Sequence, residues 1–417
     1  MKKTVIDTTK ETQFSDAWLF LALLLTFVGL WLNSAFLTAA AGLILILTLC
    51  CWLWDRYSYH GLSYQRSFSE DRAFQGETIT LQMEVRNRKL LPLPWLNISD
   101  QFPTTLPLSD KTLTADSTTN IAWMRTFWSL APFQKIRRTV EVDCVERGFF
   151  QYGPAKLHTG DGFGFFSSKA TLPKQDRLIV YPRLYSVVDL NIPTRNPFGN
   201  SRATGQLFED PLRTVGIREW QQRDSLRRIH WKATARHQEL LSRIYEPSEE
   251  QQILIFLNVA TLERHWHGHI PELQERTISV AGSLAALAIE ERLSVGLIAN
   301  GTLPGSDQAL RLMPGRAPGQ LTRILELLAA VTPFAAQPIE QLLMQEAPRV
   351  PWGSTLVLVT AIAHESLLAT LMDLAAAGRT VVLFTLAKEP PIQLLPNIRI
   401  YHLPHLVEDL IAPTLVA

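Results

Sequence analysis

The chain is poor in cysteine, and neither sign of charge dominates it. Its 417 residues include three cysteines, of which Cys50 and Cys51 are adjacent. Because so few thiols cannot build a disulfide network, a small disulfide-stapled secreted scaffold is excluded. Forty Lys and Arg against 39 Asp and Glu leave a formal net charge of +1. That balance argues against a protein coated in nucleic acid, and we expect no nucleic-acid partner.

Several catalytic motifs are also missing from the sequence. No Gly-rich loop ends in Lys-Ser/Thr, so the chain is not itself an ATPase of that type. His-Glu-x-x-His, Gly-x-Ser-x-Gly and a Gly-x-Gly-x-x-Gly after a strand are absent as well. Cys144 ends an alternating β pattern, which indicates packing and disfavours a transglutaminase-like thiol. We therefore expect no catalytic residues, no cofactor and no metal.

Two long apolar runs stand near the start of the chain. The first covers 17–32 and the second 35–54, with Asn33-Ser34 between them. Each is close to the roughly 20 residues that a helix needs to cross the hydrocarbon core of a bilayer. Since backbone groups in lipid must bond internally, we predict an N-terminal tail over 1–16 and a transmembrane helical hairpin over 17–56. The lipid bilayer is thus an expected partner.

The distribution of Lys and Arg predicts the orientation of this hairpin. Basic residues flank both runs, and none lies in the turn between them; the flanking ones are Lys2, Lys3, Lys10, Arg56, Arg66 and Arg72. The positive-inside rule then places both termini in the cytoplasm, with two passes through the inner (plasma) membrane. The alternative is a cleaved signal peptide that begins at Lys2-Lys3, with the second run left as an anchor.

Residues 60–190 have the two-residue period of β-strands. Apolar residues alternate with polar ones from Ile79 to Val85 and again from Ile136 to Cys144. Several short strands with turns between them predict a β-sandwich-like domain. Residues 161–166, with three phenylalanines, are expected to form a packed corner of that sandwich.

The segment 200–250 is the most distinctive part of the sequence. Seven Lys and Arg fall between positions 213 and 236, against Glu219 and Asp224. Asp224 or Ser225 is expected to cap a short helix. Its inward residues would be Leu226, Ile229 and Ala233.

Four interpretations of this segment remain open. Its arginines and tryptophans could fill a seam between domains, form a docking surface for an anionic partner, bind nucleic acid, or surround an enzyme site at His230. We favour a partner-binding block of seven residues: Arg218, Asp224, Arg228, His230, Trp231, Lys232 and Arg236.

This block resembles the bacterial family called domain of unknown function 58. The resemblance also rests on Arg243 to Glu246, on Arg147-Gly148 with Tyr152-Gly153-Pro154, and on 161–166 followed by 180–182. Gly162 and Arg223 stand where the family has proline and glycine. The resemblance implies a membrane hairpin, a β-domain and a domain similar to the von Willebrand factor type A fold. Genes of this family, which has no established enzymatic activity, commonly accompany those of MoxR-type AAA+ ATPases and transglutaminase-like proteins.

Residues 251–417 alternate between apolar strands and helices. Strands are expected at 253–257, 295–299, 355–360, 380–386 and 398–403, and helices at 273–292, around 321–328 and at 366–377. This order is typical of a mostly parallel sheet covered on both faces, as in the type A-like α/β domain that the resemblance implies.

The metal site of a type A fold is degenerate in this sequence. That site needs Asp-x-Ser-x-Ser after the first strand, but Asn258, Ala260 and Leu262 occupy those positions. His265, His267 and His269 could bind a transition metal, but we interpret them as a solvated loop.

These observations predict a membrane-anchored, non-catalytic adaptor or scaffold that presents protein-binding surfaces. The resemblance implies a MoxR-type AAA+ ATPase as its partner, with a transglutaminase-like membrane protein as a further candidate. The alternative is a cell-envelope hydrolase that uses His230 with Asp224 or Glu246.

Overall fold

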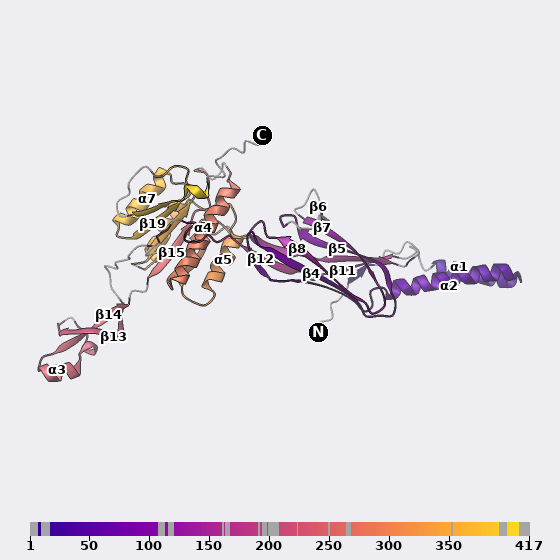
Figure 1. Ribbon diagram of the computed structural model, residues 1–417, viewed down its shortest axis with the longest axis horizontal. Coiled ribbons are helices and arrows are strands. Elements are labelled where there is room, and N and C mark those ends of the chain that lie inside the picture. The colour runs from indigo at the N-terminus through magenta and orange to yellow at the C-terminus, as the bar shows by residue number, and fades with distance from the viewer. Residues whose placement is uncertain are drawn as a thin grey trace. The chain divides into compact units, whose positions relative to one another are not determined.

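The structure is a computed structural model (Figure 1). It describes residues 7–9, 17–106, 113–115, 121–160, 162, 167–190, 192–193, 198, 208–222, 224–248, 251–263, 268–351, 353–391 and 398–407. The chain divides into two compact units, 1–181 and 182–417. The finer division predicted from the sequence, into segments 1–16, 17–56, 60–190, 200–250 and 251–417, stays a prediction.

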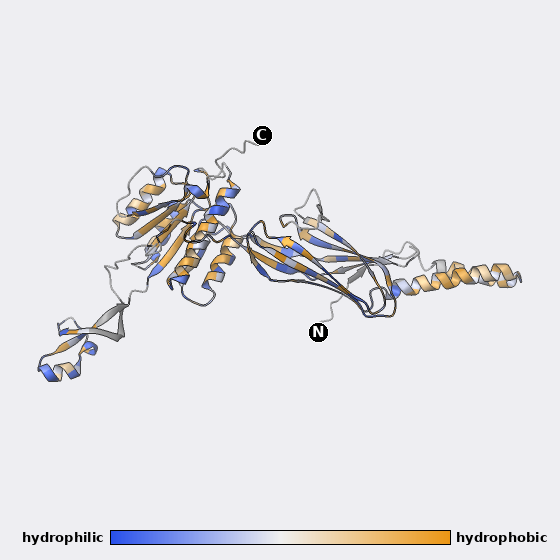
Figure 2. Cartoon of the chain, in the orientation of Figure 1, coloured by the Kyte–Doolittle hydropathy of each residue, from blue (hydrophilic) through white to orange (hydrophobic). Residues whose placement is uncertain are grey.

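Two apolar helices open the first unit: α1 (Ala17–Trp31) and α2 (Ala35–Tyr57). They pack closely, because a Cβ added at Gly29 would lie 3.0 Å from the backbone nitrogen of Thr38. Their buried apolar residues, Ala22, Ala41 and Cys51, are all small, as is usual where helices meet in lipid. Figure 2 shows hydrophobic colouring along most of the pair.

Among the described residues, one helix is long and apolar enough to cross a membrane. Its apolar stretch, Ala35–Trp54, has a mean hydropathy of 2.3. The apolar stretch of α1, Phe20–Trp31, is shorter. The prediction of an apolar helical region near the start of the chain is therefore confirmed.

The rest of the first unit is built from strands. They are β1 (Asp7–Thr9), β2 (Leu62–Phe68), β3 (Arg72–Phe74), β4 (Thr78–Asn87), β5 (Leu93–Pro103), β6 (Leu113–Ala115), β7 (Ile121–Leu130), β8 (Lys135–Asp143), β9 (Gly148–Tyr152), β10 (Ala155–Gly160), β11 (Ser167–Leu172) and β12 (Asp176–Tyr181). One sheet has the order β1-β11-β10-β5-β7-β6, and two three-stranded sheets have the orders β2-β4-β8 and β3-β12-β9.

The predicted alternation is present in these strands. In β4, Ile79, Leu81, Met83 and Val85 are buried in the core of the unit, while the residues between them are partly or fully exposed. The β-rich middle of the chain is thus confirmed. Of the predicted aromatic corner at 161–166, all but Gly162 lies outside the described residues.

The edge strand β1 comes from before the two apolar helices. It pairs antiparallel with β11, and Thr8 lies opposite Ala170. The backbone on the N-terminal side of α1 and the backbone far beyond α2 therefore belong to one sheet.

The second unit is built around a six-stranded sheet. Its strands are β15 (Gln252–Leu257), β16 (Ser294–Ala299), β17 (Leu310–Gly315), β18 (Thr355–Thr360), β19 (Thr380–Thr385) and β20 (Ile398–His402). Their order is β17-β16-β15-β18-β19-β20, and every neighbouring pair is parallel except β16 with β17. The prediction of a mostly parallel sheet is therefore confirmed.

Helices supply the layers on the two faces of this sheet: α4 (Pro271–Glu290), α5 (Gln320–Ala330), α6 (Ile339–Glu346) and α7 (Glu365–Ala376), with short turns η3 (Ala347–Arg349) and η4 (Pro404–Leu406). Alternate residues of β15 enter two separate cores. Ile253, Ile255 and Leu257 join the core that includes α4 and α5, and Leu254 and Phe256 join the one that includes α6 and α7. The strand is therefore apolar throughout, because both of its faces are covered.

Strand β17 and helix α6 are among the elements of this unit that the sequence does not predict. Strand β17 lies at the edge of the sheet and alternates buried with more exposed residues, and it contains Pro314. Helix α6 has eight residues, too few for a clear period.

Candidate functional site

The predicted partner-binding block folds as a small module of its own. Strands β13 (Phe208–Glu219) and β14 (Leu241–Ser248) pair as a two-stranded antiparallel sheet. The turn η1 (Leu226–Arg228) and the helix α3 (Trp231–His237) lie between them in sequence. An isolated bridge joins Ile229 to Ser242 and ties the connecting segment back to β14.

Asp224 fixes the end of strand β13. Its Oδ1 lies 2.6 Å from a guanidinium nitrogen of Arg218, and its Oδ2 accepts the backbone N–H of Gln221 at 3.0 Å. The hydrogen bond from Arg218, followed by that from Gln221, lowers the pKa of the Asp224 carboxyl. Two of the seven predicted residues therefore form an ion pair, and both carboxylate oxygens are used to hold the turn.

His230 caps the first turn of α3. Its Nδ1 accepts the backbone N–H of Ala233 at 3.1 Å, and the same N–H also donates to the His230 carbonyl oxygen at 2.9 Å. The hydroxyl of Thr234 accepts the backbone N–H of Leu241 at 3.1 Å and so fastens the helix to β14. Because Nδ1 accepts a hydrogen bond, a neutral His230 ring carries its proton on Nε2.

The helix expected in this block is divided, and one of its three inward residues is wrong. Ser225 caps η1, and His230 caps the separate helix α3. Ile229 and Ala233 are buried as predicted, but Leu226 is 70% exposed. The extended backbone at Ile229 shifts the helical register between the two pieces, so Leu226 does not share their face.

The outer surface of the module combines an aromatic ring with positive charge. Trp231 is 67% exposed, and its neighbours Lys232 and Arg236 are exposed too. Arg228 is half-buried. Structure thus gives the seven predicted residues two roles: Arg218, Asp224 and His230 hold the module together, and the others contribute side chains toward its surface.

The residue pairs of the hydrolase alternative have other partners where they are described. Asp224 is bound to Arg218 and Gln221, and Nδ1 of His230 is bound to Ala233. Glu246 lies in β14, where it pairs with Asp210, but its side chain lies outside the described residues.

A second candidate site lies at the carboxyl edge of the six-stranded sheet. Strand order reverses between β15 and β18, and such a switch point is where open α/β sheets bind ligands. A pocket of about 280 Å³ is found there, and Asn258, Ala260 and Asn300 contribute to its lining. Leu262, two positions after Ala260, is partly exposed.

The degenerate metal position is part of a closed amide network. Oδ1 of Asn258 accepts from Nδ2 of Asn300 at 2.9 Å and from the backbone N–H of Ala260 at 3.1 Å. Its Nδ2 donates to Thr360 at 3.1 Å. The two bonds to Oδ1 occupy both lone pairs of the side-chain oxygen that Asn258 could offer to a cation.

Sequence reasoning missed an ion pair at this pocket. Glu340 of α6 and His364, the residue directly before α7, are bonded side chain to side chain, and Ser366 donates to the same Glu340 oxygen at 3.1 Å. The hydrogen bond to Glu340 raises the pKa of His364, and the charge of Glu263 raises it further. The same hydrogen bond lowers the pKa of the Glu340 carboxyl. The two residues are 24 positions apart in the sequence, and no motif joins them.

Metal ligands are sparse in the described part of the chain. No group of three or more His, Cys, Asp or Glu side chains there could hold a metal ion. Of the predicted histidine loop, His265 and His267 lie outside the described residues, and His269 is exposed.

The β-domain signature Tyr152-Gly153-Pro154 belongs to a buried charge network. The guanidinium of Arg66 bonds to Asp100 at 2.9 Å and to the carbonyl oxygens of Lys174 at 2.8 Å and Tyr152 at 3.5 Å. A Cβ at Gly153, where φ is +94°, would lie 2.6 Å from that guanidinium. The signature glycine is therefore required for packing around a buried arginine.

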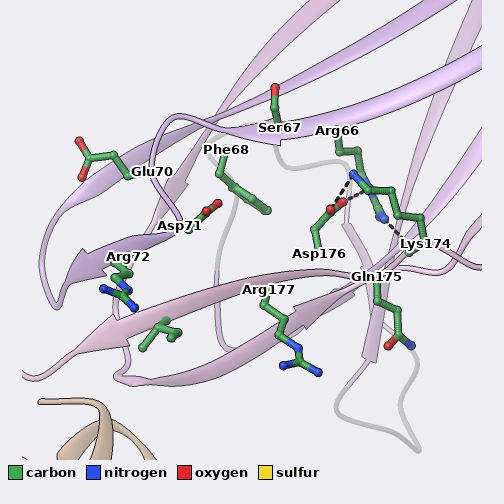
Figure 3. A pocket seen from close by; sticks show the side chains of 11 residues that line it. Arg66, Ser67, Phe68, Glu70, Asp71, Arg72, Lys174, Gln175, Asp176 and Arg177 are labelled. Carbon is green, nitrogen blue, oxygen red and sulfur yellow. Dashed lines mark hydrogen bonds and ion pairs between the residues drawn. The ribbon is translucent and has the colours of Figure 1, made fainter. Parts of the chain in front are cut away.

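This network forms one wall of a pocket of about 900 Å³ (Figure 3). Arg66 bonds there with Asp176 at 3.3 Å, and Lys174 pairs with the same carboxylate at 2.8 Å. Figure 3 shows Arg177 turned away from this group. Since the charges bind one another, we interpret the pocket as structural.

Comparison with known proteins finds similarity to one family and to one bacterial protein. The family described as "Protein of unknown function DUF58" matches residues 216–397. "Uncharacterized protein YeaD" of Bacillus subtilis (strain 168) is 20% identical over 342 residues, which are 81% of this chain and 79% of YeaD.

Solved structures match less of the chain. A CARDB domain from Pyrococcus furiosus covers 28% of this chain and 91% of its own, with 10% identity and a TM-score of 0.19. The match to alpha-2-macroglobulin from Escherichia coli covers 30% of this chain and 24% of that chain, with 14% identity and a TM-score of 0.22. The match to a cohesin module from Clostridium perfringens covers 28% of this chain and 96% of that chain, with 8% identity and a TM-score of 0.19. The DUF58 match spans residues 216–397, and that range includes the residues of both candidate sites.

Proposed function

We propose that the chain is a membrane-anchored, non-catalytic adaptor that presents the Arg218–Arg236 block to a protein partner. Helices α1 and α2 would hold it in the inner membrane as a two-pass hairpin, with both termini in the cytoplasm. Confinement to the membrane raises its effective concentration for a partner that is also membrane-bound.

Strand β1 supports an even number of membrane crossings. Residues 7–9 precede both helices and pair with 169–171, which follow them. A single crossing would separate these strands by a bilayer, whereas two crossings return the chain to the side from which it started. The basic residues that flank the runs favour the cytoplasm as that side.

The exposure of Trp231 is the observation that carries the adaptor role. A tryptophan 67% exposed on a seven-residue helix contributes little to the fold of its module. Trp and Arg are the residues that most often anchor protein interfaces. The cations beside it, Lys232 and Arg236, favour a partner with an acidic surface.

We further propose that the second unit is a degenerate type A-like domain retained for protein contacts. Its strand order with a single antiparallel edge strand supports this. The amide network at Asn258 supports a loss of cation binding at the expected position. By resemblance, the partner is a MoxR-type AAA+ ATPase, with a transglutaminase-like membrane protein as a second candidate.

A pull-down of the full-length protein from membranes tests the adaptor role. Wild type is compared with Trp231→Ala and Lys232→Ala in ATP and in ADP, and a purified MoxR-type ATPase then serves for titration. An interface anchor contributes about 2 kcal/mol, so Trp231→Ala should weaken the Kd about 30-fold. Phe334→Ala is the matched control, because Phe334 is 74% exposed in the same unit but outside the block.

The same variants separate the adaptor from the hydrolase. Equal binding by wild type and Trp231→Ala would contradict the adaptor surface. A turnover that His230→Asn abolishes, although asparagine can still cap α3, would favour the enzyme instead.

A further inference from the structure

One end of the β-domain is joined directly to the end of α2. We call it the helix-proximal tip; it comprises residues 58–61, 87–91 and 131–134. The backbone N–H of Arg88 donates to Gly61 at 2.9 Å, and that of Phe133 donates to Lys89 at 3.2 Å. The ammonium of Lys89 donates to the carbonyl of Ser58, directly after α2. These bonds fix the tip to the helix end.

Two large apolar side chains stand out from this tip. Leu90 is 76% exposed and Phe133 is 65% exposed. Phe133 also has a φ of +56°, a left-handed conformation that is costly for a residue with a bulky side chain. Neither burial nor backbone preference within the described fold accounts for a phenylalanine there. Strain of this kind is typical of positions kept for a contact.

Exposed basic residues lie near the tip in the sequence and at the adjoining end of α2. Arg56 at the end of α2 is exposed, as are Arg86 and Arg88 beside Leu90. The guanidinium of Arg56 lies 5.6 Å from the ring of Trp52, in the last turns of α2. Apolar tips among basic residues, next to a membrane helix, match the composition of the interface between lipid headgroups and acyl chains.

We propose that the helix-proximal tip rests on the bilayer, with Leu90 and Phe133 inserted at the boundary between headgroups and acyl chains. Arg86 and Arg88 then contact anionic headgroups. The proposal rests on the membrane anchoring proposed above. It adds a second attachment, through which the β-domain is held at the membrane surface.

Depth-dependent quenching tests this contact in full-length protein. Leu90→Cys and Phe133→Cys, each in a Cys50→Ala/Cys51→Ala background, carry an environment-sensitive NBD label; the remaining native cysteine, Cys144, is buried. The protein is placed in nanodiscs of phosphatidylethanolamine and phosphatidylglycerol with doxyl-labelled lipids. We expect loss of fluorescence with shallow doxyl lipids and a blue shift when phosphatidylglycerol is present.

Two further positions separate the outcomes. Glu70→Cys is the matched control, because Glu70 is exposed beyond the opposite end of β2, about 20 Å along the strand. Leu43→Cys reports on α2 itself and should be quenched by deep doxyl lipids. Quenching at Leu43 alone would overturn the tip contact and leave the anchor standing. No quenching at Leu43 would overturn both proposals, and equal quenching at positions 70, 90 and 133 would contradict a contact specific to the tip.

Discussion

At the scale of single residues, the ion pair between Glu340 and His364 makes stability depend on pH. In the folded protein the pKa of His364 is raised above its ordinary value of 6.5, and the pKa of Glu340 is lowered below its ordinary value of 4.5. The contribution of His364 is fully present below pH 6.5 and is lost as the pH rises through its folded pKa. That of Glu340 is present above pH 4.5 and is lost as the pH falls through its folded pKa.

We therefore expect the pair to stabilise the second unit most between pH 4.5 and 6.5. His364→Gln should cost about 1 kcal/mol at pH 5.5 and less at pH 8.5. Thermal unfolding of the full-length protein at the two pH values, followed by circular dichroism, measures this difference. A cost that is the same at both values would contradict the pH dependence.

Individual residues also show what could not be predicted from the sequence. Glu340 and His364 meet only because β18 brings two helix starts to one sheet edge, and their spacing carries no signal. The role of Gly153 becomes clear only once Arg66, 87 positions earlier, lies against it. Asn258, in contrast, directly follows a continuous apolar strand, and that pattern alone predicts its position at the end of a strand.

At the scale of elements, α3 depends on its cap. A helix of seven residues has little stability of its own, so the bond from the Ala233 N–H to Nδ1 of His230 adds to the few backbone bonds that hold it. We expect His230→Ala to cost about 1 kcal/mol, which is about a fivefold faster exchange of the Ala233 amide hydrogen.

Hydrogen exchange of the full-length protein, read at peptides that cover α3, measures this effect. His230→Asn is the control, because an asparagine oxygen can accept the same bond and should keep exchange near the wild-type rate. Fast exchange in both variants would show that the imidazole does something other than cap the helix.

Elements with a strong period were predicted well, and weak ones were not. The buried strands β15, β16, β18 and β19 are continuous apolar runs, which little else in a globular chain resembles. The edge strand β17 has one covered side and a proline, so its pattern is diluted. Leu226 was assigned inward because a continuous helix was assumed, whereas the extended backbone at Ile229 interrupts it.

At the scale of the whole molecule, the pairing of β1 with β11 tests the membrane topology. Thr8→Cys with Ala170→Cys should form a disulfide on mild oxidation of isolated membranes, because these residues are opposite each other. The background is Cys50→Ala/Cys51→Ala; Cys144 is buried, which raises its pKa to about 11 and keeps its thiol unreactive.

The matched control pairs Thr8→Cys with Ser67→Cys, which is exposed on a strand of a different sheet. Cross-linking only in the first pair is the expected result. Cross-linking in neither would mean that residues 7–9 and 169–171 lie apart in the membrane-bound protein, and the two-pass hairpin would lose its structural support.

The same strand constrains how the protein is made. Residues 7–9 are synthesised about 160 residues before their partners in β11. In the proposed two-pass topology, the tail must stay throughout that interval on the side where synthesis occurs, while two apolar segments pass into lipid behind it. A tail carried across would leave β11 as an open edge, free to pair with another chain. Correct insertion of the first helix thus decides whether the distant sheet is ever closed, and quality control of the membrane step and of the soluble fold become one event.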